Sequence, residues 1–147
     1  MSLKEKLMED LKASMKNKDT VRKNTITMVR AAIKQTEVDH RVELEDEQII
    51  EIISKQLKEK KNAIEDFKKG DRQDLVDLTE KEMDILLEYL PRQLTEEEIK
   101  KIVATTIDEV DAKSMKDIGM VMKSVMPKVK GRADGNTVNK IVREILK

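Results

Sequence analysis

The sequence has little of several residue types, and each shortage excludes something. Among 147 residues there is no cysteine or tryptophan, and there are only two aromatic residues, two prolines and four glycines. Without cysteine, disulfides and thiolate zinc sites or nucleophiles are excluded. β-Sandwiches and barrels need many turns and many aromatic residues, so they are disfavoured. No apolar run reaches the roughly 18 residues that span a bilayer. The first residues lack a signal-peptide core, so we expect a cytoplasmic protein that does not enter membranes.

Charged residues (41%) and apolar residues (38%) dominate instead, and the apolar ones recur at helical spacing. This pattern predicts an all-α fold: an N-terminal bundle of about four long helices and a C-terminal three-helix domain. The expected helices cover residues 2–16, 20–38, 46–69, 72–90, 96–110, 114–126 and 135–146. Pro91 to Leu94 is the expected hinge, which divides a domain of residues 1–91 from one of residues 92–147.

Helix ends carry recognisable signals. Thr95, followed by three glutamates, is a capping box. Gly70 is expected to end the third helix in the left-handed conformation, and Asp71 to cap the fourth. Asp19 and Asp134 are suitable caps for the second and the last helix. Pro127 is expected to end the sixth helix.

The sixth helix is rich in methionine, which suits both irregular cores and adaptable binding surfaces. We expect a core face on this helix, with a docking surface for a protein partner as the alternative. The core face would contain Met115, Ile118, Met122 and Val125. Gly119 lies inside the same helix, where glycine costs about 1 kcal/mol relative to alanine. Either another helix or a nucleic-acid backbone is expected to approach it closely.

The zero net charge conceals an asymmetry. Residues 113–147 hold nine basic and three acidic residues, a net charge of +6, and residues 1–112 carry −6. Three of the cations, Lys128, Lys130 and Arg132, lie in a predicted loop before the last helix. The N-terminus of that helix offers backbone N–H groups to an anion, and a solvated lysine face is the simpler explanation. Because this tail has no aromatic residue to stack on bases, a folded RNA read by its backbone is favoured over unpaired bases or a specific DNA sequence.

Residues for catalysis are scarce. His40 is the only histidine, and we expect a surface residue in a loop. The acids Glu43, Glu45, Asp46 and Glu47 lack the spacing of a calcium loop and suit a helix start. No glycine-rich phosphate loop and no nucleophile motif is present. We therefore expect no catalytic site, no bound metal and no cofactor.

Two stretches, Tyr89–Ile99 (YLPRQLTEEEI) and Lys116–Val142 (KDIGMVMKSVMPKVKGRADGNTVNKIV), resemble the GatB/YqeY family. Further similarity in Val29–Asp39 and Phe67–Pro91 extends the resemblance to its free-standing YqeY-like members and over nearly the whole chain. The family is related to the tail domain of the B subunit of glutamyl/aspartyl-tRNA amidotransferase. The resemblance implies a helical, two-part protein whose C-terminal part contacts the outer elbow of tRNA. The catalytic domains and the Ser-Ser-Lys amidase signature are missing, so amidation by this chain alone is not implied.

Three functions remain open. The first is a non-catalytic tRNA-binding accessory protein, and the second is a protein–protein adaptor. The third is a part of a carbon–nitrogen ligase (glutamine amido-N-donor) that acts only with partner subunits. The candidate RNA-binding residues are Lys116, Lys123, Lys128, Lys130, Arg132 and Lys140. A possible second basic face contains Arg22, Lys23, Arg30 and Lys34.

Overall fold

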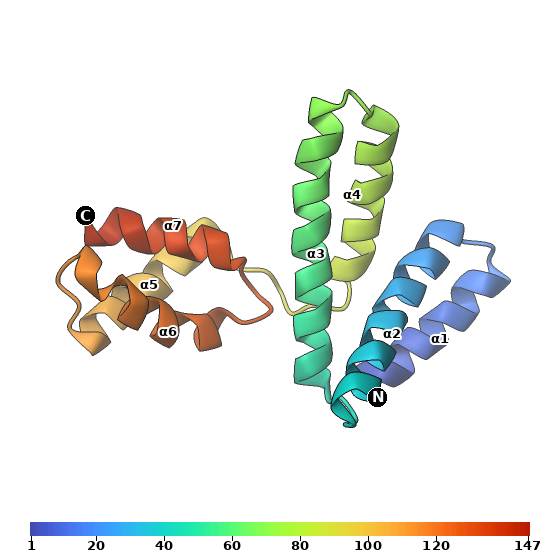
Figure 1. Ribbon diagram of the computed structural model, residues 1–147, viewed down its shortest axis with the longest axis horizontal. Coiled ribbons are helices and arrows are strands. Elements are labelled where there is room, and N and C mark those ends of the chain that lie inside the picture. Colours follow the sequence, from blue (N-terminus) through green and yellow to red (C-terminus); the bar gives the residue numbers. More distant parts are fainter. The chain divides into compact units, whose positions relative to one another are not determined.

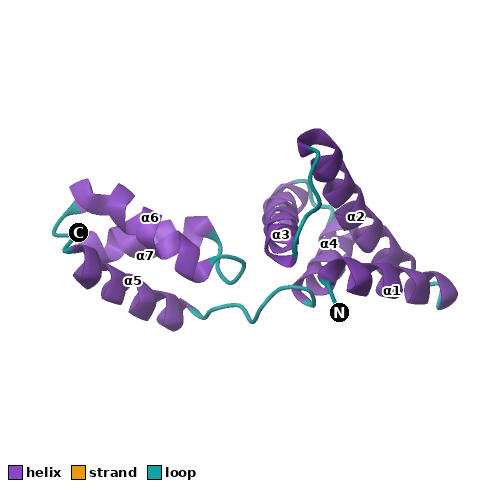
Figure 2. Ribbon diagram, turned by 90° about the horizontal axis from the view of Figure 1, so that it is seen from below, coloured by secondary structure: helices purple, strands orange, loops and turns teal.

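The computed structural model describes residues 1–147 and confirms the all-α prediction, with seven α-helices, one short 3₁₀ helix and no strand (Figures 1 and 2). The elements are α1 (Leu3–Lys16), α2 (Thr20–His40), α3 (Asp46–Lys69), α4 (Gln73–Leu87), α5 (Glu96–Val110), the 3₁₀ helix η1 (Met115–Asp117), α6 (Ile118–Val129) and α7 (Gly135–Leu146). None of these helices is both long enough and apolar enough to cross a membrane. The chain divides into two compact units, Met1–Leu90 and Pro91–Lys147.

Unit 1 contains two helical hairpins. Helix α1 packs along α2, α3 packs along α4, and α2 contacts both α3 and α4. The shared core consists of Leu7, Leu11, Ile26, Val29, Ile33, Leu44, Ile49, Ile53, Ile85, Leu86 and Tyr89. On α1, Ser14 is buried and Met15 is half exposed. The apolar residues Leu3, Leu7, Leu11 and Met15 recur every four residues and were expected to form one buried stripe, but a four-residue spacing drifts around a 3.6-residue helix, so Ser14 takes the buried position in place of Met15.

Unit 2 has its own core, to which α5, α6 and α7 each contribute one face. Helix α6 buries Val121, Val125 and Val129, which are completely inaccessible to solvent. The prediction of which residues form the core face of this helix was wrong in part. Met115 is 39% exposed because it lies in η1, before α6 begins, and Ile118 and Met122 are only partly buried.

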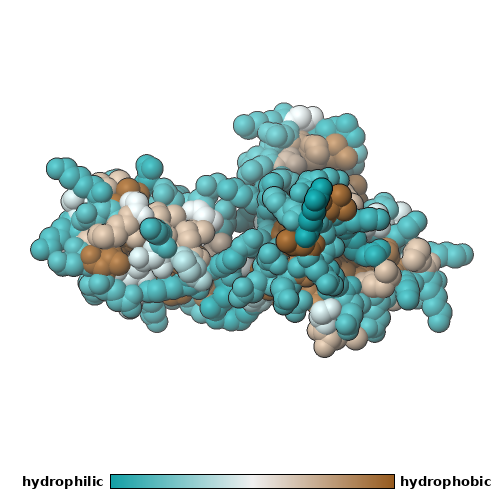
Figure 3. Space-filling model, turned by 60° about the horizontal axis from the view of Figure 1, so that its bottom comes forward, coloured by the Kyte–Doolittle hydropathy of each residue, from teal (hydrophilic) through white to brown (hydrophobic).

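The surface carries most of the charged residues. The face drawn in Figure 3 is mainly hydrophilic, with smaller apolar patches between the hydrophilic side chains. Several methionines remain exposed on the helices, among them Met8, Met28 and Met120. Single exposed apolar side chains are normal for a protein surface, so only their surroundings can make one of them significant.

Two predicted helix ends were also wrong. Pro127 lies inside α6, which continues to Val129. A proline removes one backbone hydrogen bond, and the complete burial of Val129 in the core holds the last turn in place. Gly70 has a φ of −84°, and the left-handed conformation is taken by Asp71, with a φ of 54°. Asp71 therefore does not cap α4, which begins after Arg72 without a side-chain cap.

Other end signals were interpreted correctly. The Thr95 hydroxyl accepts from the Glu98 N–H, and the Glu98 carboxylate accepts from the Thr95 N–H, which completes the capping box. Asp19 accepts from the N–H of Arg22 at the start of α2, and Asp134 accepts from the N–H of Asn136 at the start of α7.

Helix α2 ends later than predicted, so the exposed His40 is the last residue of the helix and does not lie in a loop. Arg41 takes the left-handed position after it.

Candidate nucleic-acid interface

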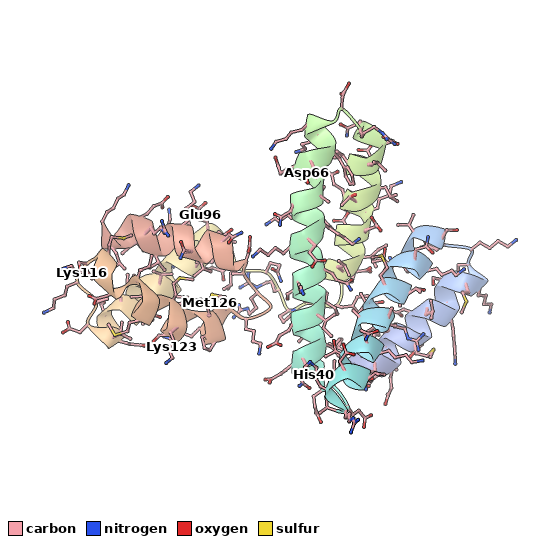
Figure 4. All side chains as sticks on the ribbon, in the orientation of Figure 1. His40, Asp66, Glu96, Lys116, Lys123 and Met126 are labelled. Atoms are coloured by element: carbon pink, nitrogen blue, oxygen red, sulfur yellow. The ribbon has the colours of Figure 1, made fainter.

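Three of the candidate cations lie at intervals of seven residues: Lys116 in η1, Lys123 in α6, and Lys130 directly after the last residue of α6. Seven residues are almost two helical turns, so these lysines share one stripe. All three are exposed, and the stripe lies opposite the buried valines of α6. It extends about 21 Å at the rise of an α-helix. We call it the α6 lysine stripe; Lys116 and Lys123 are labelled in Figure 4.

Gly119 and Met120 lie between the first two lysines of this stripe. Met120 is 44% exposed, and a Cβ built on Gly119 would meet no atom within 4 Å. The expected close approach of another helix is therefore wrong. The surface between Lys116 and Lys123 is open, so another molecule's backbone can approach it closely.

Lys128 is on the same helix but turns toward α5. Its Nζ lies 2.8 Å from the Glu109 carboxylate and 2.9 Å from Thr106 Oγ1, to which it donates. Residue Thr106 is completely buried. Lys128 therefore belongs to helix α6 rather than to the predicted loop, and an acid of α5 balances its charge.

Arg132 lies in the short loop before α7, next to Gly131, whose φ of 75° favours glycine. This loop is fastened to the segment that precedes α5. The Leu94 N–H donates to the Arg132 carbonyl at 2.8 Å, and Gln93 Nε2 donates to the Gly131 carbonyl at 2.8 Å. The Arg132 side chain is partly buried, and its Nε donates weakly to the Arg92 carbonyl at 3.4 Å.

The predicted anion site at the start of α7 carries its own carboxylate. Asp134 accepts from the Asn136 N–H at 3.2 Å, so an incoming phosphate would meet a negative charge at this helix end. Lys140 is exposed on the same helix. Arg143 and Lys147 share its face, and Glu144 interrupts it. The three- and four-residue spacing of these cations was a signal that the prediction missed.

The possible second basic face of unit 1 divides into separate parts. Arg22 forms an ion pair with Glu88 at 2.6 Å and another with Asp19 at 3.4 Å. Those contacts raise the pKa of its guanidinium, with the hydrogen bond to Glu88 as the largest cause, although burial opposes it. Lys23 is exposed beyond the ion-paired region. Arg30 and Lys34 lie further along α2, in a groove that α1 also lines.

Metal binding and reactions at hydroxyl groups would need other residues than these lysines. The structure brings together no group of three or more residues able to hold a metal ion. The hydroxyl groups of the four buried residues Ser14, Thr25, Thr79 and Thr106 each donate to a carbonyl of their own helix, whereas the buried Ser54 hydroxyl of α3 has no hydrogen-bond partner.

The structure thus defines a class of protein: an all-helical chain of two units, with a stripe of exposed lysines on the second unit. The family described as "Yqey-like protein" matches residues 4–146, and the chain belongs to this family.

Relatives with curated names extend this picture. The protein "Altered inheritance of mitochondria protein 41, mitochondrial" of Pyrenophora tritici-repentis is 31% identical over 144 residues, which are 96% of this chain and 79% of that protein. A protein of the same name from Lachancea thermotolerans is 38% identical over 85 residues, 57% of this chain and 46% of that one. A glutamyl-tRNA(Gln) amidotransferase subunit of Saccharolobus solfataricus is 39% identical over 66 residues, 44% of this chain and 10% of that protein.

Proposed function

We propose that this chain is a non-catalytic RNA-binding accessory protein, and that folded tRNA contacts it at the α6 lysine stripe. The observation that carries the proposal is the seven-residue spacing of three exposed lysines: Lys116 in η1, Lys123 in α6 and Lys130 at the C-terminal end of α6. A row of cations about 21 Å long can follow several phosphates of a folded backbone.

The surroundings of the stripe agree with backbone contacts. No aromatic side chain lies in residues 91–147, so stacking on unpaired bases is not available. The open surface at Gly119 lets a sugar–phosphate backbone come close to the helix between two lysines. The similarity to a protein named for glutamyl-tRNA(Gln) amidotransferase supports tRNA over other folded RNAs.

Salt-dependent binding tests the proposal. Fluorescence anisotropy of labelled total tRNA is measured at several salt concentrations for the native chain and for the double variant Lys116→Gln/Lys123→Gln. Each lost phosphate contact lowers the slope of log affinity against log salt by about 1, so the double variant should lower it by about 2. The matched control is Lys100→Gln/Lys101→Gln, two exposed lysines of α5 in the same unit.

The outcomes separate the candidate functions. Salt-sensitive binding that only the stripe variant weakens supports the RNA-binding function. Equal weakening in both variants would mean that RNA is attracted by general charge, and the stripe assignment would fail. No tRNA binding at low salt would overturn the proposal and leave the protein–protein adaptor as the better candidate.

A further inference from the structure

A groove of about 910 Å³ runs between the two helices of the first hairpin in unit 1. Every residue that lines it belongs to α1 or α2, so neither α3 nor α4 of the same unit covers it. Its floor includes Leu7 and Ile33, which also belong to the core, and the exposed Ala31 lies at its edge on α2. Met8 is 37% exposed and lies on the α1 side. A groove with apolar residues between two helices is a common binding site for an amphipathic helix of another protein.

Some charged side chains along this groove form ion pairs, and others have no ion-pair partner. Lys4 and Glu37 form an ion pair across one end of it. Lys12, Arg30 and Lys34 line the groove and form no ion pair. On α1, Lys4, Met8 and Lys12 follow one another at four-residue spacing and form one stripe beside the buried Leu7 and Leu11.

Two acids, Glu5 and Glu9, also line the groove and have no ion-pair partner. They are offset by one residue from the stripe of Lys4, Met8 and Lys12, so they lie on its outer side. The inner walls of the groove are thus cationic on both helices, with an apolar floor between them.

We propose that this groove binds an amphipathic helix of a partner protein, with apolar residues on one face and acidic residues on both flanks. The apolar face would cover Met8 and Ala31, and the acids would pair with Lys12 on one side and with Arg30 and Lys34 on the other. An RNA backbone would meet the same cations but would leave the apolar floor in contact with water or phosphate. The floor therefore favours a protein helix, and the three unpaired cations specify its charge.

This inference does not rest on the proposed RNA binding, because the groove and the α6 lysine stripe are on different units. The two can succeed or fail separately. A variant of one surface also serves as a control for the other.

The test uses the full chain with ¹³C-methyl-labelled methionine and three synthetic peptides of about 18 residues, or five helical turns. The first has leucines at helical spacing and glutamates on both flanks. The second has the same composition in scrambled order, and the third carries lysine in place of glutamate. Met8 is the only methionine that lines the groove, so its methyl signal reports on binding there, and Met120 reports on α6.

We expect the acidic amphipathic peptide to shift the Met8 signal and to leave Met120 unchanged. The double reversal Arg30→Glu/Lys34→Glu should weaken its affinity by about tenfold and should favour the lysine peptide instead. The control reversal Lys58→Glu/Lys61→Glu, at two exposed positions of α3, should change the affinity by less than about twofold. Met8→Glu, at an exposed position, is a second variant that should also weaken binding.

Four results would overturn the inference. One is a Met8 signal that no peptide shifts at millimolar concentration. The second is equal binding of the ordered and scrambled peptides, and the third is equal loss in the groove and control variants. In the fourth, vesicles of phosphatidylglycerol shift Met8 and the acidic peptide does not, which would make the groove a lipid-binding surface.

Discussion

The hydroxyl of Tyr89 donates a hydrogen bond of 2.5 Å to the Asp10 carboxylate and so ties the end of α4 to α1. Tyr89 is 7% exposed and is part of the core of unit 1. Lys6 donates to the other oxygen of Asp10 at 3.1 Å. Burial opposes ionisation of Asp10, but the hydrogen bonds from Tyr89 and Lys6 outweigh it and lower its pKa.

Replacing Tyr89 with Phe keeps the ring and removes the hydroxyl. The Asp10 carboxylate then loses its partly buried donor, so we expect the free energy of unfolding to fall by about 1–3 kcal/mol. Urea titration of the full chain measures the change. Lys6→Gln removes only the exposed ion pair and should cost about 0.5 kcal/mol or less. Equal losses in the two variants would contradict the importance of the tyrosine hydroxyl.

The same contact predicts a loss of stability at high pH. Burial and the hydrogen bond to Asp10 raise the pKa of Tyr89 above its ordinary value of 10.0. Above pH 10 the unfolded chain releases this proton and the folded chain keeps it, so stability falls as pH rises. Tyr89→Phe should show a shallower loss between about pH 10 and pH 11.5 than the native chain. Parallel curves for the two proteins in this window would contradict the prediction.

Arg92 and Glu98 form a two-bond contact at the start of unit 2, at 2.9 Å and 2.6 Å. The hydrogen bonds from Arg92, and then from the Thr95 N–H, lower the pKa of Glu98 to about 2. We expect Arg92→Ala to raise this pKa toward the ordinary 4.5. A carboxyl-detected NMR titration follows Glu98 directly, with Lys100→Ala as the control. Titration of Glu98 near pH 4.5 in the native chain would show that the contact does not persist in solution.

Helix periodicity was enough to predict the fold class of this chain. The repeat of apolar residues and the caps at Asp19, Thr95 and Asp134 are local features, and local features decide where helices form. The errors concern positions that depend on distant residues. Pro127 stays helical because Val129 is buried in a core made by other helices. The left-handed turn after α3 moved from Gly70 to Asp71, which local propensity did not favour.

The candidate site shows the same division. Charge and spacing indicated the lysines of α6, but no pattern showed which of them face an acid. Lys128 pairs with Glu109, and Arg22 pairs with Glu88, 66 positions away in the sequence. Such pairs depend on how helices pack, so only the structure separates paired cations from Lys116 and Lys123.

Lys128 tests this separation. Its ion pair with Glu109 is partly exposed, so Lys128→Gln should lower the free energy of unfolding by about 1 kcal/mol or less. Because its charge is already balanced, the affinity for tRNA should change by less than about twofold. Anisotropy and urea titration give both numbers. A loss of affinity as large as that of Lys123→Gln would place Lys128 in the RNA contact.

Gly119 gives a prediction in which stability and binding change in opposite directions. Its Cβ position is empty and its φ is not positive, so alanine fits without a clash. Gly119→Ala should raise the free energy of unfolding by about 0.5–1 kcal/mol, because alanine has the higher helix propensity and leaves fewer unfolded conformations. The added methyl group would keep an RNA backbone away from the helix. The affinity for tRNA should therefore fall by about 1 kcal/mol, a factor of about five.

The control is Thr105→Ala, at an exposed position of α5, which raises helix propensity without touching the lysine stripe. This variant should gain stability and keep its affinity for tRNA. If Gly119→Ala behaves in the same way, the glycine is not needed for close approach of a ligand. If Gly119→Ala is more stable and binds more weakly, the cost of a glycine in a helix is explained by the molecule that lies against it.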